Sequence, residues 1–184
     1  MKKAAFYTLG CKVNQYDTEA MAEAFENAGY TLVDFEEAAD VYVINTCTVT
    51  GLSSRKSRQA IRRAKQKNKD AVVVAVGCYP QTAREEVESM SEVDIIAGTA
   101  DRHMLPVYVE EFLKGKGRIT AVEDIMKKRA FEDLRIEKYK GRTRAVMKVQ
   151  DGCSQFCSYC IIPYARGPIR SRPHEDVLAE VHRL

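Results

Sequence analysis

The sequence predicts an α/β fold in which an N-terminal open parallel sheet with flanking helices is followed by the start of a (β/α) barrel. Short β-rich runs alternate with helical patterns over residues 1–113, an order typical of parallel sheets with right-handed crossovers. After a charged stretch, the strand-and-helix pattern begins again in residues 141–184. We therefore expect an N-terminal domain, a linker and the first unit of a second domain.

The N-terminal elements follow from hydrophobic periodicity. Strands are expected where short apolar or β-branched runs occur, at residues 3–9, 30–33, 41–45, 71–76 and 93–97. Helices are expected at residues 14–28, 53–69, 82–89 and 100–113. The first helix carries Ala20, Met21, Ala24 and Phe25 at helical spacing. The run at 41–45 is almost wholly apolar, as expected of a strand buried on both faces.

The remaining residues divide into a connection and an incomplete unit. Residues 114–140 contain 14 charged side chains among 27 and predict a solvent-exposed linker, with one short strand near 118–122. A strand at 143–149, a loop at 150–173 and a helix at 173–184 follow. One strand, loop and helix cannot bury a core alone. We expect this to be an N-terminal fragment whose second domain, residues 141–184, is truncated.

Composition narrows the classes of protein. The chain has 184 residues, 45% hydrophobic and 30% charged, which indicates a globular protein. It has no apolar run of membrane-spanning length and no signal peptide, so we expect no membrane partner and a cytoplasmic location. Six cysteines are too few for a disulfide scaffold and suggest metal binding or chemistry. The net charge of +3 conceals an acidic part, residues 1–113, and a basic part, residues 114–184.

Three cysteines lie within eight residues of one another, on the predicted loop at 150–173. Cys153, Cys157 and Cys160 form a Cys-x3-Cys-x2-Cys triplet. Soft thiolate ligands favour iron–sulfur clusters or zinc, and three ligands leave one iron of a 4Fe-4S cluster open to a substrate. Structural zinc and chance clustering of thiols are the alternatives.

The other three cysteines, Cys11, Cys47 and Cys78, each follow a predicted strand. The carboxyl ends of parallel strands share one edge of a sheet, so these thiols could hold one cluster there. Gly10 and Gly77 precede two of them and would allow sharp turns. The alternative is that each cysteine is an ordinary small buried residue.

The triplet Cys153, Cys157 and Cys160 has Tyr159 as its aromatic residue, in the pattern Cys-x3-Cys-x-aromatic-Cys. This pattern resembles the cluster loop of radical S-adenosylmethionine (SAM) enzymes. That resemblance implies a 4Fe-4S cluster whose free iron binds SAM and an electron transfer that cleaves SAM to a 5′-deoxyadenosyl radical. It also implies that Tyr159 lies near the cluster and the adenine. Ordinary packing beside the loop is the alternative role for this tyrosine.

The words around the other cysteines resemble the N-terminal domain of the methylthiotransferases, which are radical SAM enzymes with two 4Fe-4S clusters. The words are Gly-Cys-Lys-Val-Asn-Gln from residue 10, Asn-Thr-Cys-Thr-Val-Thr from residue 45 and Gly-Cys-Tyr-Pro-Gln from residue 77. They are most similar to the branch that acts on N6-threonylcarbamoyladenosine in tRNA, next to the anticodon. The resemblance implies that Cys11, Cys47 and Cys78 hold an auxiliary cluster, and that flavodoxin or ferredoxin supplies electrons.

Several alternatives stay open at this point. The enzyme could belong to the isopentenyladenosine branch, or the chain could be an iron–sulfur electron carrier or a zinc module that binds RNA. Eight basic residues in 53–69 could contact tRNA phosphates or form a solvated helix face. Arg166, Arg170 and Arg172 could meet SAM or RNA anions, or belong to a flexible basic loop. Because a complete barrel needs about 200 residues, we expect this 184-residue chain to be inactive by itself.

Overall fold

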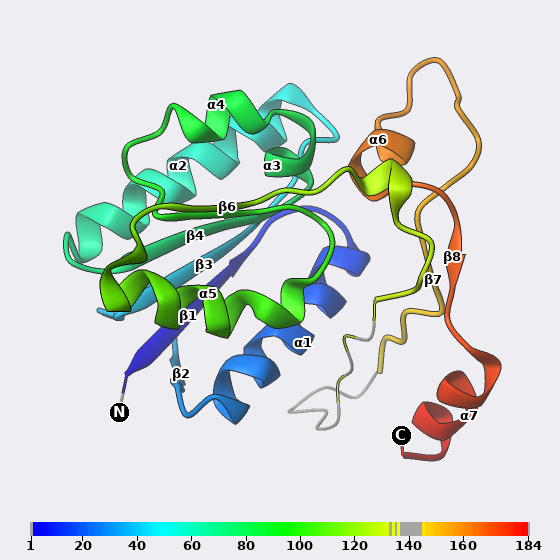
Figure 1. The fold of residues 1–184 in the computed structure, drawn as a ribbon, viewed down its shortest axis with the longest axis horizontal. Coiled ribbons are helices and arrows are strands. Elements are labelled where there is room, and N and C mark those ends of the chain that lie inside the picture. The colour runs from blue at the N-terminus through cyan, green and yellow to red at the C-terminus, as the bar shows by residue number, and fades with distance from the viewer. Residues whose placement is uncertain (1, 133, 135, 137–144, 184) are drawn as a thin grey trace.

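One parallel sheet organises the N-terminal part of the molecule. The computed structural model describes residues 2–132, 134, 136 and 145–183. Six strands lie in the order β2-β1-β3-β4-β5-β6, each parallel to its neighbours (Figure 1). Their bounds are β1 Lys3–Thr8, β2 Thr31–Val33, β3 Val41–Thr46, β4 Val72–Gly77, β5 Ile95–Ala97 and β6 Ile119–Ala121. The expected open parallel sheet is confirmed.

Helices cover both faces of this sheet, with α1 and α5 on one side and α2, α3 and α4 on the other (Figure 1). Their bounds are α1 Lys12–Asn27, α2 Gly51–Lys67, α3 Cys78–Thr82, α4 Arg84–Glu88 and α5 Leu105–Glu111. Shorter turns are η1 Arg102–Met104, η2 Phe112–Lys116 and η3 Ile125–Lys127. The helix expected at 82–89 is the shorter α4, and a separate helix, α3, precedes it, because the backbone leaves helical geometry at Ala83. None of the described helices combines the length and apolarity needed to cross a membrane.

The central strands are buried on both faces, which explains their apolar sequence. All six residues of β3 and of β4 are buried. Val43 of β3 belongs to the same packed cluster as Phe25 of α1, whereas Ile44 packs in the opposite cluster with Ile61 of α2. Successive side chains of a strand point to opposite faces, so one strand serves both layers.

The segment expected to be a solvent-exposed linker contributes to this domain. The short strand expected near 118–122 is confirmed as β6, which pairs with β5 at the edge of the sheet. Ile125, Leu134 and Ile136 are buried, the last two in the core beside α1. The expected exposure holds for most of the described residues between 114 and 136, but these three apolar side chains pack on the domain. The division at residues 113 and 140 stays a prediction.

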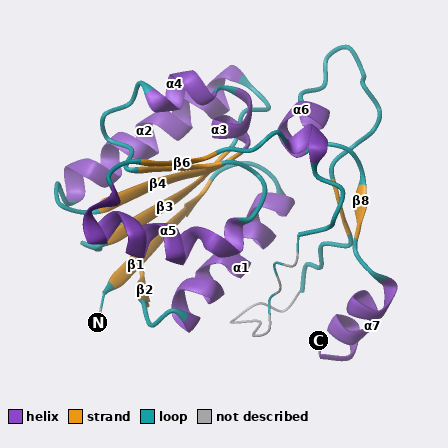
Figure 2. Cartoon of the chain, viewed as in Figure 1, coloured by secondary structure: helices purple, strands orange, loops and turns teal. Residues whose placement is uncertain are grey.

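The C-terminal part has little regular structure. The strand expected at 143–149 begins outside the described residues, and residues 145–149 form no strand. A two-residue strand, β7 Gln150–Asp151, instead pairs antiparallel with β8 Arg170–Ser171 (Figure 2). The Val149 carbonyl accepts one hydrogen bond from the Arg172 amide, at 2.9 Å, but the ladder with β8 covers only Gln150 and Asp151. Without a longer neighbouring strand, residues 145–149 do not form a strand. Helix α6, Ile162–Arg166, lies within the loop, and α7, His174–Arg183, confirms the final expected helix.

Candidate metal centre

Cys11, Cys47 and Cys78 follow three strands that end at one edge of the sheet. They follow β1, β3 and β4, which are adjacent parallel strands. The pairing brings Thr8 opposite Asn45 and Thr46 opposite Gly77, so the three strands end at the same level. The prediction that these strand ends share an edge is confirmed, although the cysteines are far apart in sequence.

The three thiols are free and differ in exposure. Cys47 and Cys78 are buried, with 5% and 4% of their surface exposed, whereas Cys11 is exposed. Cys11 is the residue that caps the N-terminus of α1, yet it makes no side-chain capping hydrogen bond. Serine, threonine, aspartate or asparagine normally fills that position. A helix N-terminus stabilises negative charge, so a cysteine at this position can act as a thiolate ligand.

Polar side chains hold the cysteine loops in place. The Asn14 amide donates hydrogen bonds to the carbonyl oxygens of Leu9, at 2.6 Å, and Thr46, at 3.0 Å. Thr46 in turn donates from Oγ1 to the carbonyl of Val76 at 2.7 Å. These bonds connect the ends of β1, β3 and β4, so Asn14 and Thr46 hold the three strand ends next to one another.

Two glycines allow the chain to turn beside the thiols. Gly10 and Gly77 have φ angles of 106° and 104°, a region that residues with a side chain rarely adopt. A Cβ at Gly10 would lie 3.0 Å from Sγ of Cys47, and one at Gly77 would lie 2.6 Å from Oδ1 of Asn45. The expected role of both glycines in sharp turns is confirmed.

The chemistry of this edge fits a thiolate-bound cluster. Among the described residues, no three histidine, cysteine, aspartate or glutamate side chains stand in a geometry that could hold a metal ion. The fit therefore rests on the donor set, which is three unoxidised thiols at one sheet edge. Burial raises the pKa of the Cys78 thiol, and the nearby Arg166 guanidinium opposes that rise.

The second triplet lies on a projecting loop. Cys153 and Cys160 are partly exposed, and Cys157 is exposed. The loop is closed at its base by a hydrogen bond of 3.0 Å from the Cys153 amide to the Gly167 carbonyl. Tyr159 is 90% exposed, which excludes the alternative that it packs beside the loop in this structure. The three thiols and Tyr159 are thus at least partly accessible to solvent.

A buried network of charged side chains lies between the two triplets. It contains three acids and four bases, none of which sequence reasoning assigned to a buried site: Asp17, Glu132, Asp151, Arg102, Lys148, Arg166 and Arg170. Asp17 of α1 is at its centre. Asp17 pairs with Arg102, with Lys148 at 2.9 Å and with Arg166 at 2.8 Å. Three cations hold its pKa well below the usual range, although burial opposes ionisation.

The arginines after the cluster loop are not a flexible basic loop. Arg166, Arg170 and Arg172 are all buried. Arg172 pairs with Glu180 of α7, and Arg170 lies 3.9 Å from Asp151. In this structure their anionic partners are carboxylates of this chain, in place of the SAM or RNA anions considered from the sequence. The signal available in the sequence was Asp17, an acid at helical spacing with the apolar residues Ala20, Met21 and Ala24.

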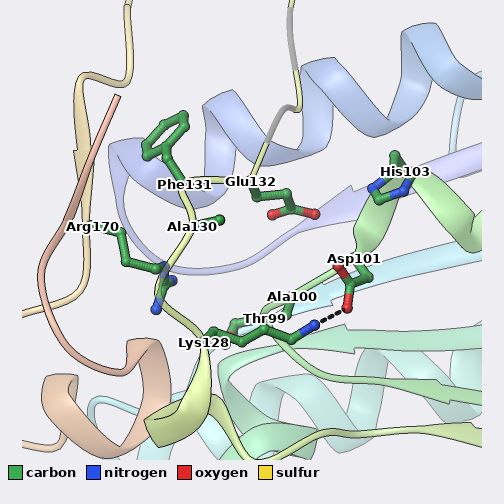
Figure 3. Close-up of a pocket in the computed structure, with 9 residues that line it drawn as sticks. All are labelled: Thr99, Ala100, Asp101, His103, Lys128, Ala130, Phe131, Glu132 and Arg170. Atoms are coloured by element: carbon green, nitrogen blue, oxygen red, sulfur yellow. Dashed lines mark hydrogen bonds and ion pairs between the residues drawn. The ribbon is translucent and has the colours of Figure 1, made fainter. Parts of the chain in front are cut away.

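A pocket borders the network on the side of η1. Figure 3 shows Arg170 and Glu132 in its lining, together with the ion pair between Lys128 and Asp101. Asp101 has a φ of 53°, the only positive φ of a non-glycine residue in the described chain. Arg102 follows it, and its amide and guanidinium both donate to Glu132. The turn at Asp101 therefore directs Arg102 into the buried network.

The basic face of α2 is largely neutralised by acids. Five of its cations form ion pairs: Arg58 with Glu86, Arg62 with Glu92, Lys65 with Asp94, and Arg63 and Lys67 with Glu36. Of the two explanations for this stretch, a solvated helix face accounts for these pairs. Arg55 and Lys56 remain exposed near the Cys47 loop.

The chain is similar to known proteins along its whole length. The chain is 48% identical over its whole length to "Threonylcarbamoyladenosine tRNA methylthiotransferase MtaB" of Bacillus subtilis (strain 168), covering 41% of that protein. It is 43% identical to the protein of the same name from Aquifex aeolicus (strain VF5), over 99% of this chain and 44% of the relative. "tRNA-2-methylthio-N(6)-dimethylallyladenosine synthase" of Dictyoglomus thermophilum is 34% identical, over 100% and 42%. The chain spans about two fifths of the length of these relatives.

A solved structure and a family profile complete the comparison. The structure is a radical S-adenosylmethionine methyltransferase, TsrM, from Kitasatospora setae, with cobalamin and a [4Fe-4S] cluster bound. It shares the fold with a TM-score of 0.58 and 15% identity, over 98% of this chain and 45% of that one. The profile described as "Uncharacterized protein family UPF0004" matches residues 3–98, the part that carries Cys11, Cys47 and Cys78. The chain therefore belongs to the UPF0004 family.

Proposed function

We propose that this chain is part of a radical SAM methylthiotransferase that adds a methylthio group to C2 of N6-threonylcarbamoyladenosine next to the anticodon of tRNA. The observation that carries the proposal is that Cys11, Cys47 and Cys78 follow three adjacent parallel strands, whose ends lie at one edge of the sheet. The printed names of the relatives from Bacillus subtilis and Aquifex aeolicus support the transferase reaction and its tRNA substrate.

The cofactors we propose are two 4Fe-4S clusters and SAM. The ligands are two sets of three thiols: Cys11, Cys47 and Cys78 for the auxiliary cluster, and Cys153, Cys157 and Cys160 for the cluster that binds SAM. With these groups bound, the site would supply sulfur transfer together with radical chemistry from the one-electron reduction of SAM. Tyr159, exposed on the second loop, would lie beside SAM.

The residues of the chain prepare the site for that chemistry. Asn14 fixes the backbone before Cys11 and Cys47, and Gly77 lets the chain turn into Cys78. Burial of Cys47 and Cys78 keeps water from two of the three sulfur atoms. The exposed second loop leaves its three thiols accessible to SAM and to an electron donor.

The partners we propose follow from the reaction. The substrate is tRNA, as the names of the relatives support. The electron for reduction comes from an external donor such as flavodoxin or ferredoxin, and no membrane partner is proposed. A tRNA substrate places the protein in the cytoplasm.

The substrate branch is supported by the order of similarity. The threonylcarbamoyladenosine relatives from Bacillus subtilis and Aquifex aeolicus are 48% and 43% identical, and the dimethylallyladenosine relative from Dictyoglomus thermophilum is 34% identical. The words around Cys11 and Cys47 favour the same branch. The isopentenyladenosine branch is the alternative substrate.

Nucleoside analysis of tRNA from a strain that lacks the gene tests this function. We expect 2-methylthio-N6-threonylcarbamoyladenosine to disappear and its precursor without the methylthio group to accumulate. The gene should restore the nucleoside, and the gene with Cys11→Ala should not. If the methylthio derivative of isopentenyladenosine disappears instead, the substrate is isopentenyladenosine and the proposed branch is wrong. Unchanged nucleosides would favour an electron carrier without SAM chemistry.

A further inference from the structure

Arg166 joins the two cysteine sets in space. It ends α6, shortly after the loop with Cys153, Cys157 and Cys160, but its guanidinium reaches into the N-terminal domain. One nitrogen, Nη2, donates to Oδ1 of Asn14 at 2.5 Å, and Nη1 donates to Oδ2 of Asp17 at 2.8 Å. Only 5% of the side chain is exposed. The contact is therefore built into the interior and is not a surface encounter.

Asn14 passes this contact on to the cysteine loops. Its amide nitrogen donates to the carbonyl oxygens of Leu9 and Thr46, which come just before Cys11 and Cys47. Because Arg166 binds the oxygen of the same amide, it fixes which way the amide points. The guanidinium thus determines the orientation of the side chain that holds two strand ends together.

Arg166 also lies near the loop of the third cysteine. Helix α3 begins at Cys78 and packs against α6, the helix that ends at Arg166. Arg166 is therefore next to the elements that carry all three cysteines.

Arg166 is a member of the buried network that reaches towards the cysteine loops. It pairs with Asp17 at 2.8 Å and donates to Oδ1 of Asn14, whose amide binds the backbone just before Cys11 and Cys47. A cluster held by three thiolates has net negative charge, so a buried cation near it would attract that charge.

We propose that Arg166 is a positioning residue for the N-terminal cysteine set, and that its positive charge favours the reduced state of the cluster held there. This inference rests on the proposed function. The segment that carries the SAM cluster thereby contributes one side chain to the surroundings of the other cluster. Reduction adds negative charge to the cluster, and a nearby buried cation stabilises that charge.

The test is a redox titration of the N-terminal cluster alone. The 184-residue chain with Cys153→Ala, Cys157→Ala and Cys160→Ala is reconstituted anaerobically with iron and sulfide, and the midpoint potential is followed by absorbance and electron paramagnetic resonance. Adding Arg166→Gln should lower the reduced-to-oxidised ratio at a fixed potential about tenfold, or about 59 mV for one electron. Arg166→Lys keeps the charge and should recover most of the potential.

Two comparisons separate this role from a structural one. Arg58→Gln removes the same charge from an arginine that binds the Tyr79 hydroxyl and Glu86, and it should leave the potential unchanged. If Arg166→Gln unfolds the chain by orphaning Asp17, the comparison is made between Asp17→Asn and Asp17→Asn with Arg166→Gln, and the same drop is expected. Equal potentials with and without Arg166 would overturn the inference. A chain that binds no cluster at Cys11, Cys47 and Cys78 would overturn the proposed function and the inference with it.

Discussion

At the scale of single residues, small polar side chains give the site its shape. Asn45 donates from Nδ2 to the carbonyl of Asn14 at 2.9 Å and to Oγ1 of Thr18 at 3.0 Å. Ser57 of α2 donates to the carbonyl of Cys47 at 3.3 Å. Asn14 and Asn45 belong to the motifs seen in the sequence, whereas Thr18 and Ser57 lie outside them, and only the fold shows the hydrogen bonds that all four make.

Replacing Gly77 with alanine should destabilise the protein by about 1–3 kcal/mol. The φ and ψ angles of 104° and −151° are almost restricted to glycine, and a Cβ would lie 3.0 Å from the Thr46 carbonyl oxygen. Gly51→Ala is the matched control, because nothing lies within 4 Å of a Cβ there and its φ is ordinary. Urea unfolding measures both variants. Equal stability of the two would show that the turn into Cys78 does not need glycine.

The free energy of unfolding should fall in acid through Asp17. The folded-state pKa of Asp17 lies well below its value of about 3.9 in the unfolded chain. The unfolded state therefore binds more protons below that pH, and the stabilisation present at higher pH is lost as the pH falls from about 4 towards the folded pKa.

Urea titrations from pH 3 to pH 7 measure this dependence. Asp17→Asn should cost about 3–5 kcal/mol at neutral pH, because it leaves buried cations without their partner, and it should flatten the acid limb. Asp70 is exposed, so the Asp70→Asn variant should show the same change of unfolding free energy with pH as the unaltered chain. An identical acid limb in the Asp17→Asn variant would contradict the assignment.

At the scale of elements, packing decides where each helix lies. Helix α2 buries Ser57, Ala60, Ile61 and Ala64, and most of its other side chains are basic or polar. Ile61→Ala should destabilise the protein by about 2–5 kcal/mol, because it opens a cavity under a fully buried side chain. Leu52→Ala, at a residue that is 60% exposed, should change the stability by less than about 0.5 kcal/mol. Denaturant unfolding measures both variants, and equal losses of unfolding free energy in Ile61→Ala and Leu52→Ala would contradict this packing.

The elements also show how far sequence patterns reach. Apolar runs predicted β3 and β4 well, because parallel strands buried on both faces have a distinctive composition. The break at Ala83 and the irregular backbone of residues 145–149 were not predicted. A strand pattern records apolar spacing, but it cannot show whether a neighbouring strand is present to pair with it.

At the scale of the whole molecule, the buried charge network ties distant segments together. Asp17 comes from α1, Arg102 from η1 and Arg166 from α6. Thr99 adds a hydrogen bond of 2.7 Å to the carbonyl of Ala165, so the cluster loop is docked on the N-terminal domain at several points. Sequence reasoning found the six cysteines because their local spacing and context are distinctive. It missed the network because ion pairs between distant residues leave no local pattern.

The central claim is that six cysteines hold two separate 4Fe-4S clusters. Iron and sulfide determination after anaerobic reconstitution tests it most directly, in the unaltered chain and in two triple variants. The account predicts about eight irons for the unaltered chain. It predicts about four for Cys11→Ala, Cys47→Ala, Cys78→Ala and about four for Cys153→Ala, Cys157→Ala, Cys160→Ala. Tightly bound zinc in place of iron, or loss of all iron in either triple variant, would contradict two independent clusters.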